Sequence, residues 1–325
     1  MKQALIVLGM HRSGTSAVAG TLSQLGICFG SKLYRPQPEV NEKGFFEHAD
    51  IVDVNDEALL AIGSSWDDIL PLPEHGWTES RLQTLTHKLR RYLRRDVADG
   101  ILWGLKDPRL CRLLPWWLEL LDQEGINARY LLTVRHPLEV ADSLRQRDGF
   151  SQGKSIILWI EHNLASEYWT RNQIRTTIEF EALLSDPTAT LTRVEQELEL
   201  MFPRPPHRQL ADIQQFLADD LRHHRHHPTT DNAPHPNPLL ELAEHLYQCL
   251  RSLAGTPRQD AVFDALAAEF ENKRFADTDT LVEHLRLVTR DRSEQQRLIR
   301  QIFRSHAWQL GKPLRFLERF LGGEA

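Results

Sequence analysis

Residues 9–16 have the types and the spacing of a loop that binds phosphate. They read Gly-Met-His-Arg-Ser-Gly-Thr-Ser, follow an apolar run that ends at Leu8, and lead into a helical pattern. A turn of this kind gathers backbone N–H groups at a helix N-terminus, where the helix dipole adds positive potential. Gly9 and Gly14 let the backbone approach a ligand closely. This segment, called the phosphate loop below, predicts a site for a phosphate-type anion.

The phosphate loop differs at one position from the loop that binds nucleoside triphosphates. Its two glycines match the first six positions of the pattern G-x-x-x-x-G-K-[ST], but Thr15 occupies the lysine position. A kinase or ATPase uses that lysine on the β- and γ-phosphates, beside a magnesium site. The nearest cation fixed in the loop is instead Arg12. A kinase is therefore disfavoured, and a strand-turn-helix without a ligand is the other alternative.

Arg135 and Ser143 form a second candidate phosphate site. Arg135 ends an apolar strand pattern, and Ser143 lies two helical turns into the next element. Ligands of open α/β sheets bind at the carboxyl ends of the strands, and a guanidinium with a hydroxyl suits a phosphate monoester. Pairing of Arg135 with Glu139 or Asp142 on an exposed helix start is the alternative.

These two segments resemble motifs of the P-loop sulfotransferases that use 3′-phosphoadenosine 5′-phosphosulfate (PAPS), bacterial members included. The run from His11 to Ser16 resembles their 5′-phosphosulfate loop, and the segment 129–143 resembles their 3′-phosphate motif. The resemblance extends to about Pro187 and implies PAPS as co-substrate, 3′,5′-ADP as product and no required metal. The residues that it implies for PAPS binding are Arg12, Ser13, Gly14, Thr15, Ser16, Arg135 and Ser143.

The same resemblance implies catalytic roles for Lys106 and Arg12. Lys106 follows a strand pattern in the run Leu-Lys-Asp-Pro-Arg that ends at Arg109. It is similar to the lysine of the N-K-D-P segment in tyrosylprotein sulfotransferases, which assists the transfer. Arg12 is expected to stabilise charge on the bridging and leaving oxygens. The alternatives are a Lys106–Asp107 pair, a surface position for Arg109 and an exposed loop charge at Arg12.

The general base is expected in the segment 41–48, which resembles the substrate-loop region of bacterial and Golgi sulfotransferases. Glutamate serves as the base in several of these enzymes, so Glu47 is the first candidate. Phe45 and Phe46 precede it and would desolvate its carboxylate, which raises the pKa toward neutrality and favours proton abstraction. His48 and a residue that the sequence does not identify are the alternatives. His11 is expected to line the acceptor pocket or to pack there, without a catalytic role.

The elements that must position these residues follow an alternating pattern of strands and helices. Apolar runs separated by helical patterns predict an α/β fold with a parallel sheet wrapped by helices. The four β-type runs are residues 4–8, 101–105, 130–134 and 177–180. Pro137 and the pair Asp186–Pro187 predict helix starts directly beyond the third and fourth runs.

Composition limits the classes of protein that fit. The net charge of −6 argues against general nucleic-acid binding. The three cysteines, Cys28, Cys111 and Cys249, are scattered and indicate neither a disulfide framework nor a zinc site. The first apolar run is too short for a signal peptide, and no run reaches the ~18 residues that cross a bilayer. The expected location is the cytoplasm, with attachment to the inner membrane face as the alternative.

The chain is expected to divide into a core, a linker and a helical extension. Residues 1–222 form the predicted catalytic core, and 223–238, with consecutive histidines and four prolines, read as a linker. Such histidines rarely give a fixed metal geometry, so no metal site is expected there. Residues 239–325 form the helical extension.

The end of this extension is a basic amphipathic tail. Residues 283–320 carry nine Arg/Lys and four Asp/Glu. The run from Ser305 to Arg315 weakly resembles tails of bacterial surface-polysaccharide transferases. This tail would contact an anionic membrane face, a second copy of the chain or its own core.

These patterns together predict a transferase. The expected reaction is transfer of a sulfuryl group from PAPS to a hydroxyl or amine of a glycan, a glycolipid or other lipid-linked acceptor, or a small molecule. A nucleotide-dependent kinase and a non-catalytic nucleotide-binding scaffold are the alternatives. No nucleic-acid partner is expected.

Overall fold

A computed structural model describes residues 2–35, 44–72, 80–98, 100–221, 239–253, 260–275 and 280–290 of the chain. The chain divides into two compact units, residues 1–276 and residues 277–325. The sheet and the candidate site belong to the first unit.

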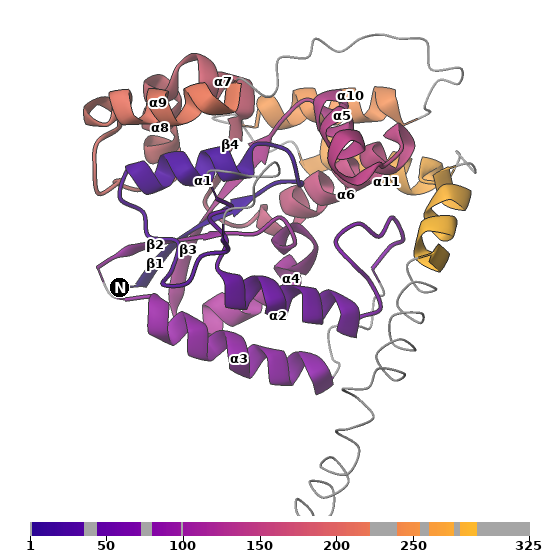
Figure 1. Ribbon diagram of the computed structural model, residues 1–325, viewed down its shortest axis with the longest axis horizontal. Helices are drawn as coiled ribbons and strands as arrows, with labels where there is room; N and C mark the ends of the chain where they lie inside the picture. Colours follow the sequence, from indigo (N-terminus) through magenta and orange to yellow (C-terminus); the bar gives the residue numbers. More distant parts are fainter. Residues whose placement is uncertain are drawn as a thin grey trace, which may run out of the picture. The chain divides into compact units, whose positions relative to one another are not determined.

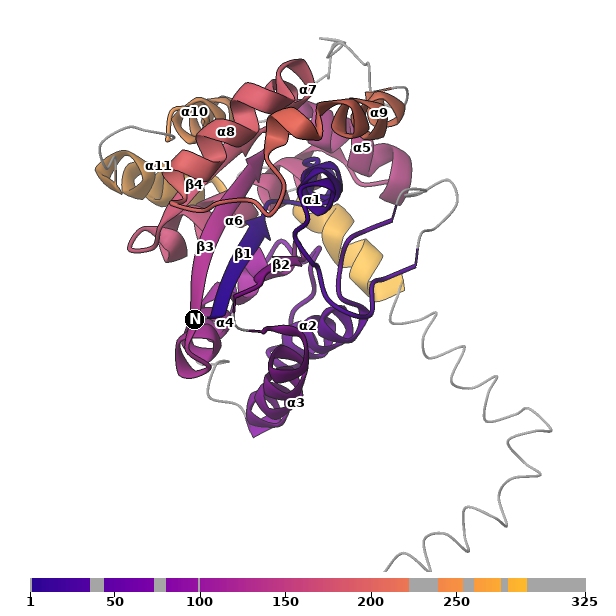
Figure 2. The same cartoon turned by 90° about the vertical axis from the view of Figure 1, so that its left-hand side faces the viewer.

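The first unit is built on a sheet of four parallel strands (Figures 1 and 2). The strands are β1 (Lys2–Leu8), β2 (Leu102–Lys106), β3 (Ile126–Val134) and β4 (Arg175–Glu179), in the order β2-β1-β3-β4. Every neighbouring pair is parallel. Strands covered on both faces read as continuous apolar runs, which is why the runs of β1, β2 and β3 are recognisable in the sequence, whereas β4 reads Arg-Thr-Thr-Ile-Glu. The predicted parallel sheet is confirmed.

Helices cover both faces of this sheet (Figure 2). The helices are α1 (Thr15–Gln24), α2 (Ala49–Ala61), α3 (Ser80–Asp96), α4 (Leu110–Gln123), α5 (Pro137–Asp148), α6 (Gln152–Thr170), α7 (Phe180–Ser185), α8 (Pro187–Glu197), α9 (Leu210–Leu221), α10 (Leu240–Arg251) and α11 (Asp260–Lys273). Side chains of β1 alternate between two apolar layers. Ala4, Ile6 and Leu8 pack with residues of α2, α3 and α4. Leu5 and Val7 pack with residues of α1, α8 and α9.

Two helices that follow strands begin where the sequence predicts. Pro137 is the first residue of α5, and the ring of His136 caps this helix by accepting a hydrogen bond from the amide of Leu138. Pro187 is the first residue of α8, and Asp186 Oδ1 accepts from the amide of Ala189 at 2.9 Å. Proline suits this position because its missing N–H has no partner there in any case.

The described helices of the predicted extension lie partly in the first unit. α10 contacts α5, α6, β3 and β4, and α11 contacts α6 and α10. The proposed linker 223–238 and the tail beyond residue 290 lie outside the described residues. The division into a core that ends at residue 222 and a separate extension therefore stays a prediction.

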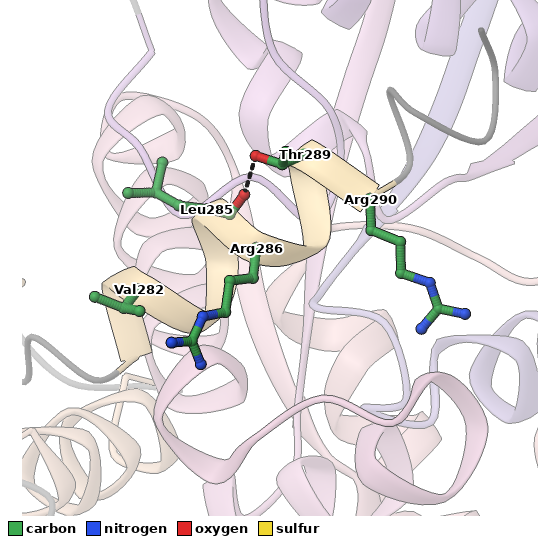
Figure 3. A pocket seen from close by; sticks show the side chains of 5 residues that line it. All are labelled: Val282, Leu285, Arg286, Thr289 and Arg290. Atoms are coloured by element: carbon green, nitrogen blue, oxygen red, sulfur yellow. Dashed lines mark hydrogen bonds between the residues drawn. The ribbon is translucent and has the colours of Figure 1, made fainter. Parts of the chain in front are cut away.

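The described part of the second unit is a helical stretch over residues 280–290. Figure 3 shows a pocket on this stretch, lined by Val282, Leu285, Arg286, Thr289 and Arg290. Thr289 Oγ1 donates to the carbonyl oxygen of Leu285 at 2.7 Å within the same helix. Among the helices that the structure describes, none is long and apolar enough to span a bilayer.

Candidate active site

The phosphate loop joins β1 to α1 in a backbone conformation that needs its glycines. Gly9 has φ 142° and Gly14 has φ 87°. A Cβ atom at Gly14 would lie 2.3 Å from the Phe180 ring, and one at Gly9 would lie 2.6 Å from the Thr133 carbonyl oxygen. Arg12 adopts φ 67°, a left-handed conformation that is uncommon outside glycine. The backbone of the loop therefore requires glycine at positions 9 and 14.

This loop presents the N-terminus of α1 without a competing carboxylate. The first turn of α1 contains no acidic residue. The hydroxyl of Ser13 is buried, with no hydrogen-bond partner in the described part of the chain. Backbone N–H groups at a helix start and a buried hydroxyl without a partner are the donors that an anion would use.

The four strands bring the other predicted residues to the same edge of the sheet. Lys106 ends β2 opposite Val7 of β1, and Arg135 directly follows β3. Glu179 ends β4 opposite Val134 of β3. Because all four strands are parallel, their carboxyl ends and the phosphate loop lie at one edge, where open α/β sheets bind ligands.

Lys106 connects the phosphate loop to Glu47. Its ammonium Nζ donates to Glu47 Oε1 at 2.6 Å and to Ser16 Oγ at 3.1 Å. The Lys106 side chain is 3% exposed and that of Glu47 is 9% exposed. One buried cation therefore links the loop to the first candidate for the general base.

Asp107 and Arg109 form a separate polar group beside this pair. Asp107 accepts hydrogen bonds from Asn55 Nδ2 at 2.9 Å and from Arg109 Nη1 at 3.0 Å, so it is not the partner of Lys106. Arg109 Nη1 also lies 4.0 Å from Glu47 Oε2. Its side chain is only 13% exposed, so Arg109 belongs to the site rather than to the surface.

The environment of Glu47 raises the pKa of its carboxyl. Burial is the largest cause and the charge of Asp107 adds to it, while Lys106 and Arg109 oppose the shift. Phe46, which precedes Glu47, packs edge-on against the rings of Phe29 and Phe216. In the sequence the two phenylalanines predicted this direction of the shift. A carboxylate with a raised pKa takes up a proton more readily near neutral pH.

His48, the alternative base, is engaged through both ring nitrogens. Nδ1 accepts a hydrogen bond from the amide of Ile51 at 3.3 Å and caps the start of α2. Nε2 lies 2.8 Å from Asp96 Oδ2, at the end of α3. The residue is 1% exposed. His48 thus holds two helices together in this structure, and Glu47 is the candidate base that faces Lys106.

The two predicted phosphate sites contact each other. Arg12 Nε donates to Ser143 Oγ at 2.7 Å, and Arg135 Nη1 donates to the carbonyl oxygen of Arg12 at 3.3 Å. Arg135 Nε also donates to Glu139 Oε2 at 2.7 Å, which is the pairing considered as an alternative. Arg135 is nevertheless 4% exposed, and its guanidinium lies 5.0 Å from the centre of the Phe180 ring. The pairing therefore holds a buried arginine at the sheet edge.

His11 lies on the other side of the loop, against Trp66. Their ring centres are 4.2 Å apart, and His11 Nε2 has no hydrogen-bond partner among the described residues. Burial lowers the pKa of His11 well below 6.5, and the charges of Arg109 and Arg147 lower it further. The imidazole is therefore neutral.

The segment that carries Trp66 could not be recognised from the sequence. This segment follows α2 and is held by two buried arginines that are far apart in the chain. Arg112 Nη1 donates to the carbonyl oxygens of Ser65 at 2.8 Å and Asp68 at 2.6 Å. Arg274 Nη1 donates to the carbonyl oxygen of Ile69 at 2.9 Å. Contacts of this kind leave no local pattern, because any backbone carbonyl can accept them.

Among the residues that the structure describes, no group of three or more His, Cys, Asp or Glu side chains is arranged to hold a metal ion. The histidine run 223–227 lies outside the described residues.

Three solved structures are similar to this chain. One is a sulfotransferase domain from the Synechococcus PCC 7002 olefin synthase, with 18% identity, 78% of this chain and 96% of that chain covered, and a TM-score of 0.45. The second is the sulfotransferase STF9 from Mycobacterium avium, with 16% identity, 75% of each chain covered and a TM-score of 0.42. The third is a sulfotransferase domain from the curacin biosynthetic pathway, with 13% identity, 83% and 98% covered, and a TM-score of 0.36.

Comparisons at the level of sequence find no matching family model and no matching curated protein. At the identities and TM-scores of the three structures, the likeness assigns no role to any residue of this chain.

Proposed function

We propose that the protein transfers a sulfuryl group from PAPS to a hydroxyl or amine of a glycan, a glycolipid or a small molecule. The observation that carries this proposal is the position of Lys106, which contacts Ser16 of the phosphate loop at 3.1 Å and Glu47 at 2.6 Å. Group transfer requires an anion site, a cation on the transferred group and a base for the acceptor proton. Lys106 lies where these three meet.

PAPS carries two phosphate-type groups, and the chain offers donors for both. The backbone amides of the phosphate loop, the Ser13 hydroxyl and Arg12 would bind the 5′-phosphosulfate. Arg135 and Ser143 would bind the 3′-phosphate. The hydrogen bond of 2.7 Å from Arg12 to Ser143 supports a single ligand that spans both groups. When bound, PAPS supplies the sulfuryl group that is transferred.

The base and the cation are coupled in a way that suits the transfer. The acceptor oxygen forms a bond to sulfur while the bond from sulfur to the bridging phosphate oxygen breaks, and Glu47 takes the acceptor proton. Before the transfer, the charge of Lys106 is balanced by the Glu47 carboxylate. Once Glu47 is protonated, that charge stabilises the negative charge that develops on the leaving oxygen. A buried cation is more effective there than one in water.

Transfer of labelled sulfate from PAPS to a panel of acceptors tests this function. The panel should include extracts of the native organism, because no residue specifies the acceptor. We expect transfer by the unaltered chain and a loss of about 10²–10³-fold in Lys106→Ala, the size found when one stabilising group is removed from a transfer site. Lys88→Ala is the matched control, since Lys88 pairs with Glu57 on the surface. Full activity of Lys106→Ala would contradict the proposed mechanism.

A further inference from the structure

α10 lies beside the end of β3 and β4, although it follows the predicted catalytic core in the chain. It contacts both strands and also α5, the helix that carries Ser143 (Figure 1). Two of its side chains, Glu244 and Tyr247, reach residues that directly adjoin the Arg135 site.

The first connection runs from Glu244 to the ring of His136, the residue that directly follows Arg135. His136 Nδ1 accepts a hydrogen bond from the amide of Leu138, so in the neutral ring the proton is on Nε2. Nε2 lies 2.9 Å from Glu244 Oε1 and donates to it. On the other side, Trp159 Nε1 donates to the carbonyl oxygen of Arg135 at 3.0 Å. The strand end is thus held between α6 and α10.

The second connection runs from Tyr247 to the ring beneath the Arg135 guanidinium. Tyr247 is 5% exposed, and its hydroxyl donates to Glu179 Oε1, the last residue of β4. Its ring also packs edge-on against His136, with the ring centres 5.2 Å apart. Glu179 immediately precedes Phe180, whose ring lies 5.0 Å from the Arg135 guanidinium carbon. The Phe180 ring also fills the space beside Gly14 of the phosphate loop.

We propose that α10 positions Arg135 for the 3′-phosphate through Glu244 and Tyr247, so that the nucleotide site includes this helix. Glu244 holds the ring of His136, which directly follows Arg135, and Tyr247 holds Glu179, which directly precedes Phe180 beneath the guanidinium. A buried guanidinium binds a phosphate well only when its orientation is set in advance, because the geometry of its donors is rigid. This inference rests on the proposed function, since it assigns the 3′-phosphate to Arg135.

Calorimetric titration with 3′,5′-ADP and with 5′-AMP tests this role without an acceptor, because the two nucleotides differ only in the 3′-phosphate. For the full chain carrying Glu244→Ala and Tyr247→Phe, we expect about tenfold weaker binding of 3′,5′-ADP and an affinity for 5′-AMP within about twofold of the original, since each lost contact contributes a fraction of that change. Glu244→Gln keeps a hydrogen-bond acceptor and should retain most of the affinity. Glu241→Ala, at an exposed position one turn earlier on α10, is the matched control.

The possible outcomes separate the inference from the proposed function. An equal loss for both nucleotides would mean that α10 only stabilises the fold, and unchanged binding would mean that it does not act on Arg135. Either result overturns the inference while PAPS binding stands. An unaltered chain that does not prefer 3′,5′-ADP to 5′-AMP would overturn the proposed function and the inference with it.

Discussion

At the scale of single residues, the pair of Glu47 and Lys106 is the centre of the proposed site. Burying an unpaired Glu47 carboxylate would cost free energy of folding. Lys106 offsets that cost, because its Nζ donates to Glu47 Oε1 at 2.6 Å. Burial nevertheless dominates and raises the pKa of Glu47. Lys106 opposes the rise and burial favours it, and a carboxylate with a raised pKa is the kind of group that the proposed general base requires.

The dependence of activity on pH should show this shift. A base works only when it is ionised, so a raised pKa moves the acidic limb of the rate profile to a pH above that of an ordinary glutamate. Glu47→Gln should lower the rate by about 10²–10⁴-fold and remove this limb. Initial rates of labelled sulfate transfer between pH 4 and pH 8 measure both effects. Glu57→Gln, on the exposed side of α2, is the control, and an unchanged profile in Glu47→Gln would exclude Glu47 as the base.

The sequence predicts those site residues that lie in short local motifs. Lys106 and Arg135 lie at the ends of recognisable strands, and Ser143 lies on the helix after Arg135, where it accepts a hydrogen bond from Arg12 of the phosphate loop. Trp66 and Arg274 could not be found in this way. Trp66 reaches His11 from the segment after α2, and Arg274 holds that segment from the end of α11. Such contacts depend on the packing of elements that are far apart in the chain.

At the scale of elements, α2 and α3 are joined next to Glu47, the proposed base. His48 follows Glu47 directly, caps α2 and contacts Asp96 at the end of α3. Burial by itself would raise the pKa of Asp96, but hydrogen bonds from Arg95 and Ser31 and the nearby His48 lower it to about 2. The two helices are therefore linked by a carboxylate that stays ionised in mild acid.

This link should make part of the stability depend on pH. Because the pKa of Asp96 is lower in the folded chain than the ordinary 3.8, its contribution is present above about pH 4 and is lost as the pH falls toward 2. Asp96→Asn should lack this contribution. Denaturant unfolding of both chains between pH 2 and pH 7 measures it as a difference in unfolding free energy that shrinks in acid. A difference that does not change with pH would contradict the pairing.

The type of each strand was predictable, but its neighbours and limits were not. Apolar runs mark β1, β2 and the second half of β3, because parallel strands covered on both faces are rich in apolar residues, while β4 is marked by the shorter pattern Thr-Ile-Glu-Phe. β3 begins at Ile126, earlier than the predicted Tyr130. Asn127 and Arg129 are polar, so the first half of this strand does not show the apolar pattern. The strand order β2-β1-β3-β4 depends on how the helices pack against the sheet, and a local sequence pattern does not predict that packing.

At the scale of the whole molecule, the first unit extends beyond the predicted core. It continues to residue 276 and includes α10 and α11. The side chains that these two helices bury include Leu242, Ala243, Leu246, Leu250, Phe263, Leu266 and Phe270. The helices thus contribute apolar packing as well as the contacts of Glu244 and Tyr247.

Truncated chains can distinguish a folded core that ends at residue 222, as predicted, from one that ends at residue 276, as in the structure. Burial of one large apolar side chain stabilises a protein by about 1.5–3 kcal/mol, so removing α10 and α11 should cost several such contributions. We expect a chain that ends at residue 222 to have a clearly lower Tm than one that ends at residue 276, or to aggregate. Thermal unfolding followed by circular dichroism measures this. Equal Tm values would support the predicted boundary at residue 222.

We propose that the phosphate loop and the Arg135 site together bind PAPS rather than a nucleoside triphosphate. Calorimetric titration of the full chain with 3′,5′-ADP and with ATP and magnesium tests it most directly. The proposed site predicts tighter binding of 3′,5′-ADP, and Arg135→Ala should remove the preference for the 3′-phosphate. Tighter binding of ATP with magnesium, and no response to 3′,5′-ADP, would contradict the claim and favour a kinase.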